Sequence, residues 1–456
     1  MTLESINPTT GETIETYEET APAEVAAAVD AAHDAFLGWS GRPFAERAER
    51  MTAAARVLRE RRDEYGRLMA VEMGKPIADG RAEADKCALA CEYYAEHAER
   101  FLADRPAATE AAKSYVAFRP LGVVLAVMPW NFPFWQVFRF AAPGLMAGNA
   151  ALLKHASNVS GCALAIEDVF RRAGFPEGLF RTLLVGSGRI ESEVLDHPKV
   201  RAATLTGSVA AGEAIGAQAG RRIKKTVLEL GGSDAYLVLE DADLDQAVPV
   251  CVASRLINSG QSCIAAKRFV VPRAIAAEFT ERFVAEMRGK RMGDPLDESN
   301  ALGPQARRDL RDELHEQVGR SIAKGARLLL GGEVPDGPGA FYPPTVLAGV
   351  GPGMPAYDQE LFGPAAAIIE VEDEEAAIRV ANDSRFGLGA AVFSRDSERA
   401  ERIAADRLDA GSCFVNAFVK SDPRLPFGGV KESGYGRELG RFGIEEFVNV
   451  KTVWVK

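Results

Sequence analysis

The amino-acid sequence predicts an α/β protein with a Rossmann-like, doubly wound cofactor domain and a second α/β domain. Continuous apolar runs such as residues 121–128 are typical of parallel strands that are buried on both faces. Helix-like segments at 158–173 and 209–219 lie between such runs, and this alternation indicates strand–helix units. A chain of 456 residues is also too long to fold around one ordinary hydrophobic core, so we expect more than one domain.

In chain order, the pattern predicts three N-terminal helices at 21–37, 44–72 and 79–104. The strands of the first α/β series are expected at 113–120, 121–128, 150–154, 180–185, 202–206 and 226–230, with helices at 158–173, 189–195 and 209–219. A second series follows Gly231-Gly232, with strands at 235–239, 269–271, 327–330, 366–371, 390–393 and 413–415. Its helices are expected at 243–258, 274–288, 304–323, 373–381 and 396–406. The last segment, 446–456, is a further strand that we expect to pair with a neighbouring subunit.

Composition excludes several classes of function. The 54 basic and 65 acidic residues give a net charge of −11, which argues against a nucleic-acid or anionic-membrane surface. No apolar run approaches the ~20 residues of a membrane span, and the N-terminus lacks a signal-peptide pattern, so we expect a cytoplasmic protein. The six cysteines form no Cys-x-x-Cys pair and the five histidines are scattered, which predicts reduced thiols and no metal site.

The candidate nucleophile is Cys263, which follows Gly260-Gln-Ser262 and an apolar, helix-like run at 248–257. Its small neighbours let a substrate carbonyl approach the sulfur and leave the Cys263 backbone N–H to meet a developing oxyanion. This chemistry requires an ionised sulfur. A buried structural cysteine is the alternative interpretation.

Two further residues complete a catalytic constellation. Asn131 follows the apolar run 121–128, where the carboxyl end of a parallel strand places ligands, and its amide can donate to an oxyanion. Glu229 ends the run 226–230, where burial should raise the pKa of its carboxyl toward the range of a general base. The alternatives are a turn asparagine and a salt-bridged structural glutamate.

A nucleotide site is indicated by Thr206-Gly-Ser-Val-Ala-Ala-Gly212, a strand-to-helix turn whose helix N-terminus suits a pyrophosphate. It is neither G-x-G-x-x-G nor a Walker sequence, so the signal is weak in isolation. Lys154, at another strand end, and Ser157 can bind ribose hydroxyls or a phosphate.

With these motifs, the chain resembles the aldehyde dehydrogenase superfamily over nearly its whole length. The matching motifs are Pro129-Trp-Asn131-Phe-Pro133, Lys154-His-Ala-Ser157, Thr206-Gly-Ser208, Glu229-Leu-Gly-Gly232, Gly260-Gln-Ser-Cys263, Glu360-Leu-Phe-Gly-Pro364, Asn382-x4-Gly387-Leu, Pro426-Phe-Gly-Gly429 and Lys431-Glu-Ser-Gly434. So many ordered matches are highly specific.

The resemblance implies the aldehyde dehydrogenase fold. It consists of a dinucleotide-binding domain (1–100 and 120–231), a catalytic domain (232–431), and bridging strands (101–119 and 447–456) that join subunits into a homodimer or homotetramer. It also implies that Cys263 attacks an aldehyde, that Asn131 holds the oxyanion, and that Glu229 activates water to hydrolyse the thioester. The positions that match cofactor contacts are Trp130, Lys154, Ser157, Gly207, Ser208, Leu230, Glu360 and Phe362.

The cofactor expectation depends on Ser157. Many NAD-preferring relatives have a glutamate at this position, where it would repel a 2′-phosphate. Ser157 beside Lys154 can instead donate to that phosphate. We therefore expect NADP to be preferred, with NAD as a second cofactor.

The substrate expectation depends on Arg139, eight residues after Asn131 and about two helical turns on, which places it on roughly the same face. Its guanidinium can bind the far carboxylate of a semialdehyde. With Ser421, this makes the chain similar to bacterial NADP-type succinate-semialdehyde dehydrogenases. Several relatives carry a second arginine where this chain has Ile257, which puts the chain-length preference in doubt. The other residues expected to contact substrate are Trp135 and Ser262.

Alternatives remain open at this point. Arg139 can instead form an ion pair. Phe134, Trp135 and Phe418 can form an apolar pocket for uncharged or aromatic aldehydes. A CoA-acylating enzyme would not need the base Glu229, and a catalytically silent homologue would not need the three catalytic groups.

Overall fold

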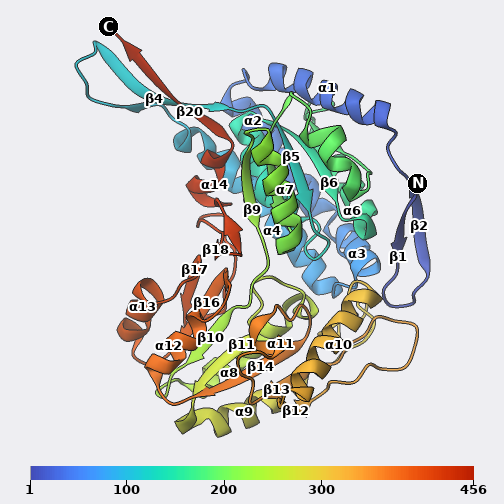
Figure 1. Ribbon diagram of the computed structural model, residues 1–456. Helices are drawn as coiled ribbons and strands as arrows, with labels where there is room; N and C mark the ends of the chain where they lie inside the picture. The colour runs from blue at the N-terminus through green and yellow to red at the C-terminus, as the bar shows by residue number, and fades with distance from the viewer. Residues whose placement is uncertain (1) are drawn as a thin grey trace.

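The first of two large sheets is built from the apolar runs of the N-terminal half. The computed structural model describes residues 2–456, and this sheet forms one of its two lobes (Figure 1). In spatial order its strands are β19 (Gly434–Tyr435), β9 (Lys225–Glu229), β8 (Val200–Thr206), β5 (Val123–Met128), β6 (Ala150–His155) and β7 (Phe180–Thr182). Strands β5 to β9 are parallel, and β19 runs antiparallel to β9. The chain progresses from β5 to β7 in one direction and from β8 to β9 in the other, so the order reverses between β5 and β8. Ligands of open α/β sheets bind at such a reversal, beside the carboxyl ends of the strands.

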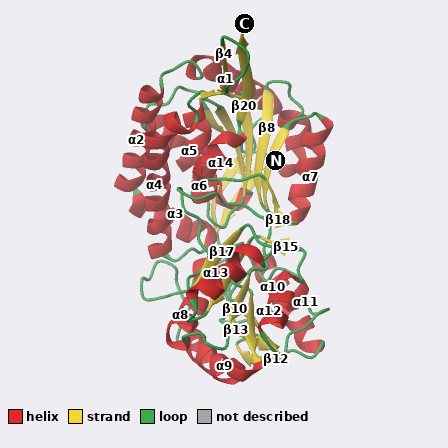
Figure 2. Ribbon diagram, turned by 90° about the vertical axis from the view of Figure 1, so that its left-hand side faces the viewer, coloured by secondary structure: helices red, strands yellow, loops and turns green. Residues whose placement is uncertain are grey.

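The helices of this lobe lie on both faces of the sheet. They are α1 (Pro22–Trp39), α2 (Phe44–Glu60), α3 (Arg62–Met73), α4 (Ile77–Phe101), α5 (Trp135–Ala147), α6 (Ser160–Arg172) and α7 (Val209–Arg221). Figure 2 shows α7 on one side of the sheet and α2, α4, α5 and α6 on the other.

The predicted helix at 44–72 is wrong in one respect, because it is broken at Arg61. This residue leaves the helical region (φ −108°, ψ 16°), and its guanidinium binds Asp168 on α6 at 2.8 Å. The spacing of apolar residues along the chain carries no information about a contact between segments so far apart in the sequence. The predicted helix at 189–195 is also irregular, because it consists of a 3₁₀ turn (Ser187–Arg189) and one π-helical turn (Glu191–Leu195).

The second sheet forms the other lobe. Its order is β12 (Arg327–Leu330), β13 (Thr345–Ala348), β14 (Ala365–Val371), β11 (Arg268–Pro272), β10 (Ala235–Val238), β16 (Gly389–Phe393) and β17 (Ser412–Val415). Strand β13 is missing from the sequence prediction. The helices of the C-terminal half are α8 (Leu244–Leu256), α9 (Arg273–Arg288), α10 (Arg308–Ala323), α11 (Pro355–Asp358), α12 (Glu374–Asn382), α13 (Ser397–Asp406) and α14 (Gly440–Glu446).

Smaller strands join or extend the lobes. A third sheet contains β3 (Arg105–Pro106), β4 (Lys113–Pro120) and β20 (Val448–Val455), and its long antiparallel pair β4–β20 projects from the body (Figure 1). Short strands β15 (Phe386–Gly387) and β18 (Val430–Lys431) pair with each other. An N-terminal hairpin, β1 (Thr2–Ile6) with β2 (Thr13–Glu18), was not expected from the sequence.

The sequence also led us to expect no membrane-spanning segment and six reduced cysteines. No helix within residues 2–456 is both long and apolar enough to cross a bilayer. The six cysteines are all free, and four of them are buried.

Candidate active site

Cys263 follows a strained turn at the end of α8. Asn258, Ser259 and Gly260 are all left-handed, with φ of 51°, 55° and 78°. A side chain at Gly260 would collide with the backbone of Gly363, so only glycine fits there. The turn stops the helix, and Cys263 is half-buried at the edge of a cavity.

Asn131 comes from the first sheet, at the loop that follows β5. Its Nδ2 donates to the Gln261 carbonyl at 3.1 Å, and its own carbonyl accepts from Asn258 Nδ2 at 2.7 Å. A carboxamide has two N–H groups, so the second one remains for a ligand. The Cys263 backbone N–H makes no hydrogen bond within the described chain. These two donors have the composition of an oxyanion hole.

Glu229 is the last residue of β9, and its side chain is 2% exposed. Neither carboxylate oxygen has a hydrogen-bond partner among the described residues. Burial, supported by the charge of Glu438, raises the pKa of Glu229 to about 8, although Arg139 and Arg437 oppose the shift. Such a carboxyl suits a general base whose ionised fraction grows with pH.

The surroundings of the Cys263 sulfur oppose its ionisation. Burial raises the pKa of the Cys263 thiol to about 12, against the opposite influence of Arg139 and Lys267. The cost of burying a charge exceeds the attraction of these cations, so the ionised sulfur that we expect of the nucleophile stays a prediction. The thiolate must form by proton transfer, and Glu229 is a nearby carboxylate that can accept the proton.

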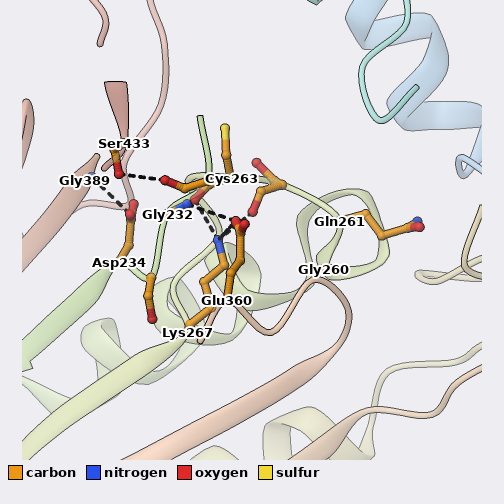
Figure 3. A network of polar contacts seen from close by, with 12 residues as sticks. Gly232, Asp234, Gly260, Gln261, Cys263, Lys267, Glu360, Gly389 and Ser433 are labelled. Atoms are coloured by element: carbon orange, nitrogen blue, oxygen red, sulfur yellow. Dashed lines mark hydrogen bonds and ion pairs between the residues drawn. The ribbon is translucent and has the colours of Figure 1, made fainter. Parts of the chain in front are cut away.

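Lys267 connects the nucleophile to Glu360 (Figure 3). Its Nζ donates to the carbonyls of Ser262 at 2.8 Å and Cys263 at 2.6 Å, and lies 3.3 Å from Glu360 Oε1. The same carboxylate oxygen accepts from the Gly232 backbone N–H at 3.0 Å. Glu360 is thereby fixed beside the strand end that carries Glu229.

A cavity of about 740 Å³ opens beside Cys263 at the reversal point of the first sheet. Six of the eight residues expected to contact cofactor line it, together with two catalytic residues: Trp130, Gly207, Ser208, Leu230, Glu360, Phe362, Asn131 and Cys263. Ser208 caps α7, whose N-terminus therefore faces the cavity. The volume, the helix N-terminus and the carboxylate of Glu360 fit a dinucleotide. The other two residues, Lys154 and Ser157, lie at the carboxyl end of β6 beside β5.

Comparison with known proteins agrees with this geometry. The sequence profile of the aldehyde dehydrogenase family matches residues 1–453. The chain belongs to the aldehyde dehydrogenase family. It is 51% identical over 455 residues to a probable succinate-semialdehyde dehydrogenase [NADP(+)] of Synechocystis, with 100% of both chains covered. It is 50% identical to the succinate semialdehyde dehydrogenase [NAD(P)+] Sad of Escherichia coli, covering 99% of this chain and 97% of that protein.

The fold of this aldehyde dehydrogenase is also that of solved structures. The succinic semialdehyde dehydrogenase of Streptococcus pyogenes, solved with NADP+, superposes with a TM-score of 0.97 at 38% identity, over 99% of each chain. The expected α/β aldehyde dehydrogenase fold is therefore confirmed.

Arg139 is buried in an ion pair in this aldehyde dehydrogenase. Its Nε lies 2.7 Å from Glu438 Oε2, and its Nη2 donates to Thr206 Oγ1 at 3.3 Å. The helical-face argument from Asn131 does not apply, because Asn131 precedes α5 and lies in a loop. The ion pair that the sequence left as an alternative is what the structure shows. A guanidinium has further N–H groups, so contact with substrate stays a prediction.

The remaining residues expected to contact substrate are buried. Ser262 is 1% exposed, and its carbonyl accepts from Lys267. Trp135 and Ser421 are joined by a hydrogen bond of 3.0 Å from the indole N–H to the hydroxyl oxygen. Phe134, which an aromatic pocket would need, is fully buried against Tyr65.

Several functional residues were missed by sequence reasoning. Glu438, Lys267, Asn258 and Lys86 each contact a catalytic or predicted substrate residue, or one of its neighbours in the chain. Only Lys267 gave a local signal, because it lies four residues after the nucleophile. Asn258 also lies close to the nucleophile in the chain, five residues before it, but Glu438 and Lys86 come from distant segments.

The raised pKa of Glu229 predicts the pH dependence of aldehyde oxidation. A general base works ionised, so kcat/KM should fall as pH drops through about 8. Glu229→Gln should lower kcat by about 10²- to 10⁴-fold and remove this dependence. Steady-state rates from about pH 6 to about pH 9 measure it. Glu213→Gln, on the exposed side of α7, is the control that keeps the wild-type profile. Persistence of the acidic limb in Glu229→Gln would contradict the assignment.

Proposed function

We propose that the protein oxidises succinate semialdehyde to succinate, with NADP as the preferred electron acceptor. The observation that carries the proposal is that Cys263 and Asn131 line one dinucleotide-sized cavity, with Glu229 directly before the lining residue Leu230 and within electrostatic reach of the thiol. The substrate is supported by full-length relatives at about half identity whose names specify succinate-semialdehyde dehydrogenase.

The chain's own residues account for the acid–base steps. Glu229 takes the thiol proton, and the Cys263 sulfur adds to the aldehyde carbon while Asn131 and the Cys263 N–H stabilise the oxyanion. Bound nicotinamide supplies the acceptor for the hydride that leaves the thiohemiacetal. Glu229 releases the thiol proton to solvent and, ionised again, deprotonates the water that hydrolyses the resulting thioester. Lys154, Ser157 and Glu360 would hold the cofactor's ribose and phosphate groups.

The function is tested by NADPH formation at 340 nm across short aldehydes. We expect succinate semialdehyde to give a higher kcat/KM than butanal, which has the same carbon chain without the carboxylate. Cys263→Ala should abolish NADPH formation while it leaves cofactor binding intact. A preference for butanal or an aromatic aldehyde would refute the proposed substrate, and activity in Cys263→Ala would refute the mechanism.

The cofactor preference is tested at Ser157. A Ser157→Glu variant places a carboxylate where the 2′-phosphate would lie, so kcat/KM for NADP should fall roughly 10- to 100-fold while that for NAD is preserved. Ser157→Ala, which removes only the hydroxyl, should cause a smaller loss. The relatives differ in their named cofactors, NADP(+) for one and NAD(P)+ for the other. A wild type that favours NAD would overturn the preference.

We also propose that the protein is a homodimer or homotetramer and resides in the cytoplasm. The pair β4–β20 projects from the body, and Val450 and Trp454 on it are 61% and 49% exposed. Such apolar exposure favours contact with a second subunit. Six free cysteines fit a reducing compartment.

The assembly depends on that projecting strand. The double variant Val450→Glu with Trp454→Glu should lower the molar mass measured by light scattering. Its two carboxylates would be buried in the contact between subunits, and the cost of burying them would weaken the assembly. Ile223→Glu alters another apolar side chain, 95% exposed and on a different surface, and should leave the mass unchanged. A monomeric wild type, or a double variant of unchanged mass, would refute the proposal.

A further inference from the structure

Lys267 is a fully buried lysine beside the nucleophile, and its ammonium group has three acceptors. Its Nζ donates to the carbonyl oxygens of Ser262 and Cys263, and it lies 3.3 Å from Glu360 Oε1 (Figure 3). A neutral amine has only two N–H groups, so three acceptors require the charged form. Burial lowers the pKa of Lys267, whereas the charges of Glu360 and Asp234 oppose this shift. The fold therefore holds a cation directly behind Cys263.

The Ser262 carbonyl and the Cys263 N–H belong to one peptide group. This group is planar and trans, so its N–H and its C=O point in opposite directions. The Ser262 oxygen accepts from Lys267 Nζ at 2.8 Å and from the Ala265 backbone N–H at 3.1 Å. These two bonds fix the direction of the C=O, and the N–H must then point away from Lys267. That N–H has no partner within residues 2–456, which leaves it for a ligand in the cavity that Cys263 lines.

The charge of Lys267 also changes the strength of this N–H as a donor. A hydrogen bond from a charged group to the Ser262 carbonyl draws electron density away from the peptide nitrogen, so the Cys263 N–H becomes a stronger donor. The effect is largest where negative charge develops on the acceptor, as it does on the aldehyde oxygen when sulfur adds to the carbonyl carbon. One side chain thus fixes both the direction and the polarity of an oxyanion donor.

Glu360 keeps Lys267 in place. Its Oε1 also accepts from the Gly232 backbone N–H at 3.0 Å, and its own carbonyl accepts from Gln317 Nε2 at 3.2 Å. A buried ammonium without a countercharge would be costly, and the anchored Glu360 carboxylate offsets that cost. Because Glu360 lines the cavity, the ion pair extends from the expected cofactor site to the peptide that carries the Cys263 N–H.

We propose that Lys267 is a positioning residue that orients and polarises the Ser262–Cys263 peptide, so that the Cys263 N–H stabilises the oxyanion. The inference rests on the proposed function and deepens it, because it concerns the oxyanion formed when Cys263 adds to the aldehyde. Lys267 touches neither substrate nor sulfur, and it acts through the peptide group.

The test compares two reactions of Cys263 in wild type and in Lys267→Met. Aldehyde oxidation passes through an oxyanion, whereas alkylation of the sulfur by iodoacetamide displaces iodide at a saturated carbon and forms none. Removing an oxyanion donor costs about 10²- to 10³-fold in kcat, and here the donor is weakened, so kcat should fall about 10- to 100-fold with little change in KM. The alkylation rate, measured by mass spectrometry of the Cys263 peptide, should fall much less.

Two further variants sharpen the comparison. Lys267→Gln keeps one neutral donor for the Ser262 carbonyl, so its kcat should lie between those of Lys267→Met and wild type. Lys290→Met is the matched control, because it removes a lysine of similar ion pairing, 2.6 Å from Glu286 at the end of α9, and should keep wild-type values in both reactions. NADPH binding, followed by fluorescence, checks that each variant is folded, and Lys267→Gln carries the same comparison if Lys267→Met is not.

The outcomes separate this role from others. Equal losses in oxidation and alkylation would show that Lys267 acts only on ionisation of the thiol, and a change in KM alone would place it in binding. Either result, or an unchanged kcat, would overturn the inference. The measurements use the aldehyde that wild type oxidises fastest. If that aldehyde is not succinate semialdehyde, the proposed substrate fails and the comparison at Lys267 still decides this inference.

Discussion

The active site depends on a hydrogen-bonded bridge between its two loops. Asn258 Nδ2 donates both to the Asn131 carbonyl at 2.7 Å and to the Gln261 carbonyl at 3.1 Å. Asn131 follows a strand of one sheet, whereas Asn258 precedes the nucleophile beside the other. Each of these buried amides would cost about 1–3 kcal/mol without its partner. These bonds hold the loop of Asn131 against the loop of Cys263, and both residues line the same cavity.

The same burial controls the protons of the site. It raises the pKa of Cys263 and of Glu229, while Arg139 lowers both. Glu438, paired with Arg139, raises the pKa of Glu229. Alone, the positive charge of Arg139 would favour ionisation of the Cys263 thiol and of the Glu229 carboxyl. Pairing with Glu438 weakens this effect. A protonated thiol is a poor nucleophile, so attack on an aldehyde requires transfer of its proton to a base such as the Glu229 carboxylate.

Much of the fold followed from local pattern, because parallel strands buried on both faces are continuous apolar runs. The candidate catalytic residues Asn131 and Glu229 were proposed for the same reason, since they stand at the ends of such runs. The break at Arg61 was missed, and the ion pair of Arg139 was only an alternative without a named partner, because the partners lie 107 and 299 residues away. Spacing along the chain cannot identify partners that only the folded topology brings together. The N-terminal hairpin was missed because it has no apolar run.

The distribution of cations has a consequence for specificity. A cation already paired with a carboxylate offers a second carboxylate little net attraction, because the charges cancel at short range. This weakens the simple view of Arg139 as the main anchor of a dicarboxylic substrate, since Glu438 lies 2.7 Å from its Nε. The hydrogen-bond partner of Lys86 Nζ is the neutral hydroxyl of Ser421, and burial lowers the pKa of Lys86 to about 8. Recognition of a second carboxylate therefore depends on where the fold leaves a positive charge uncompensated.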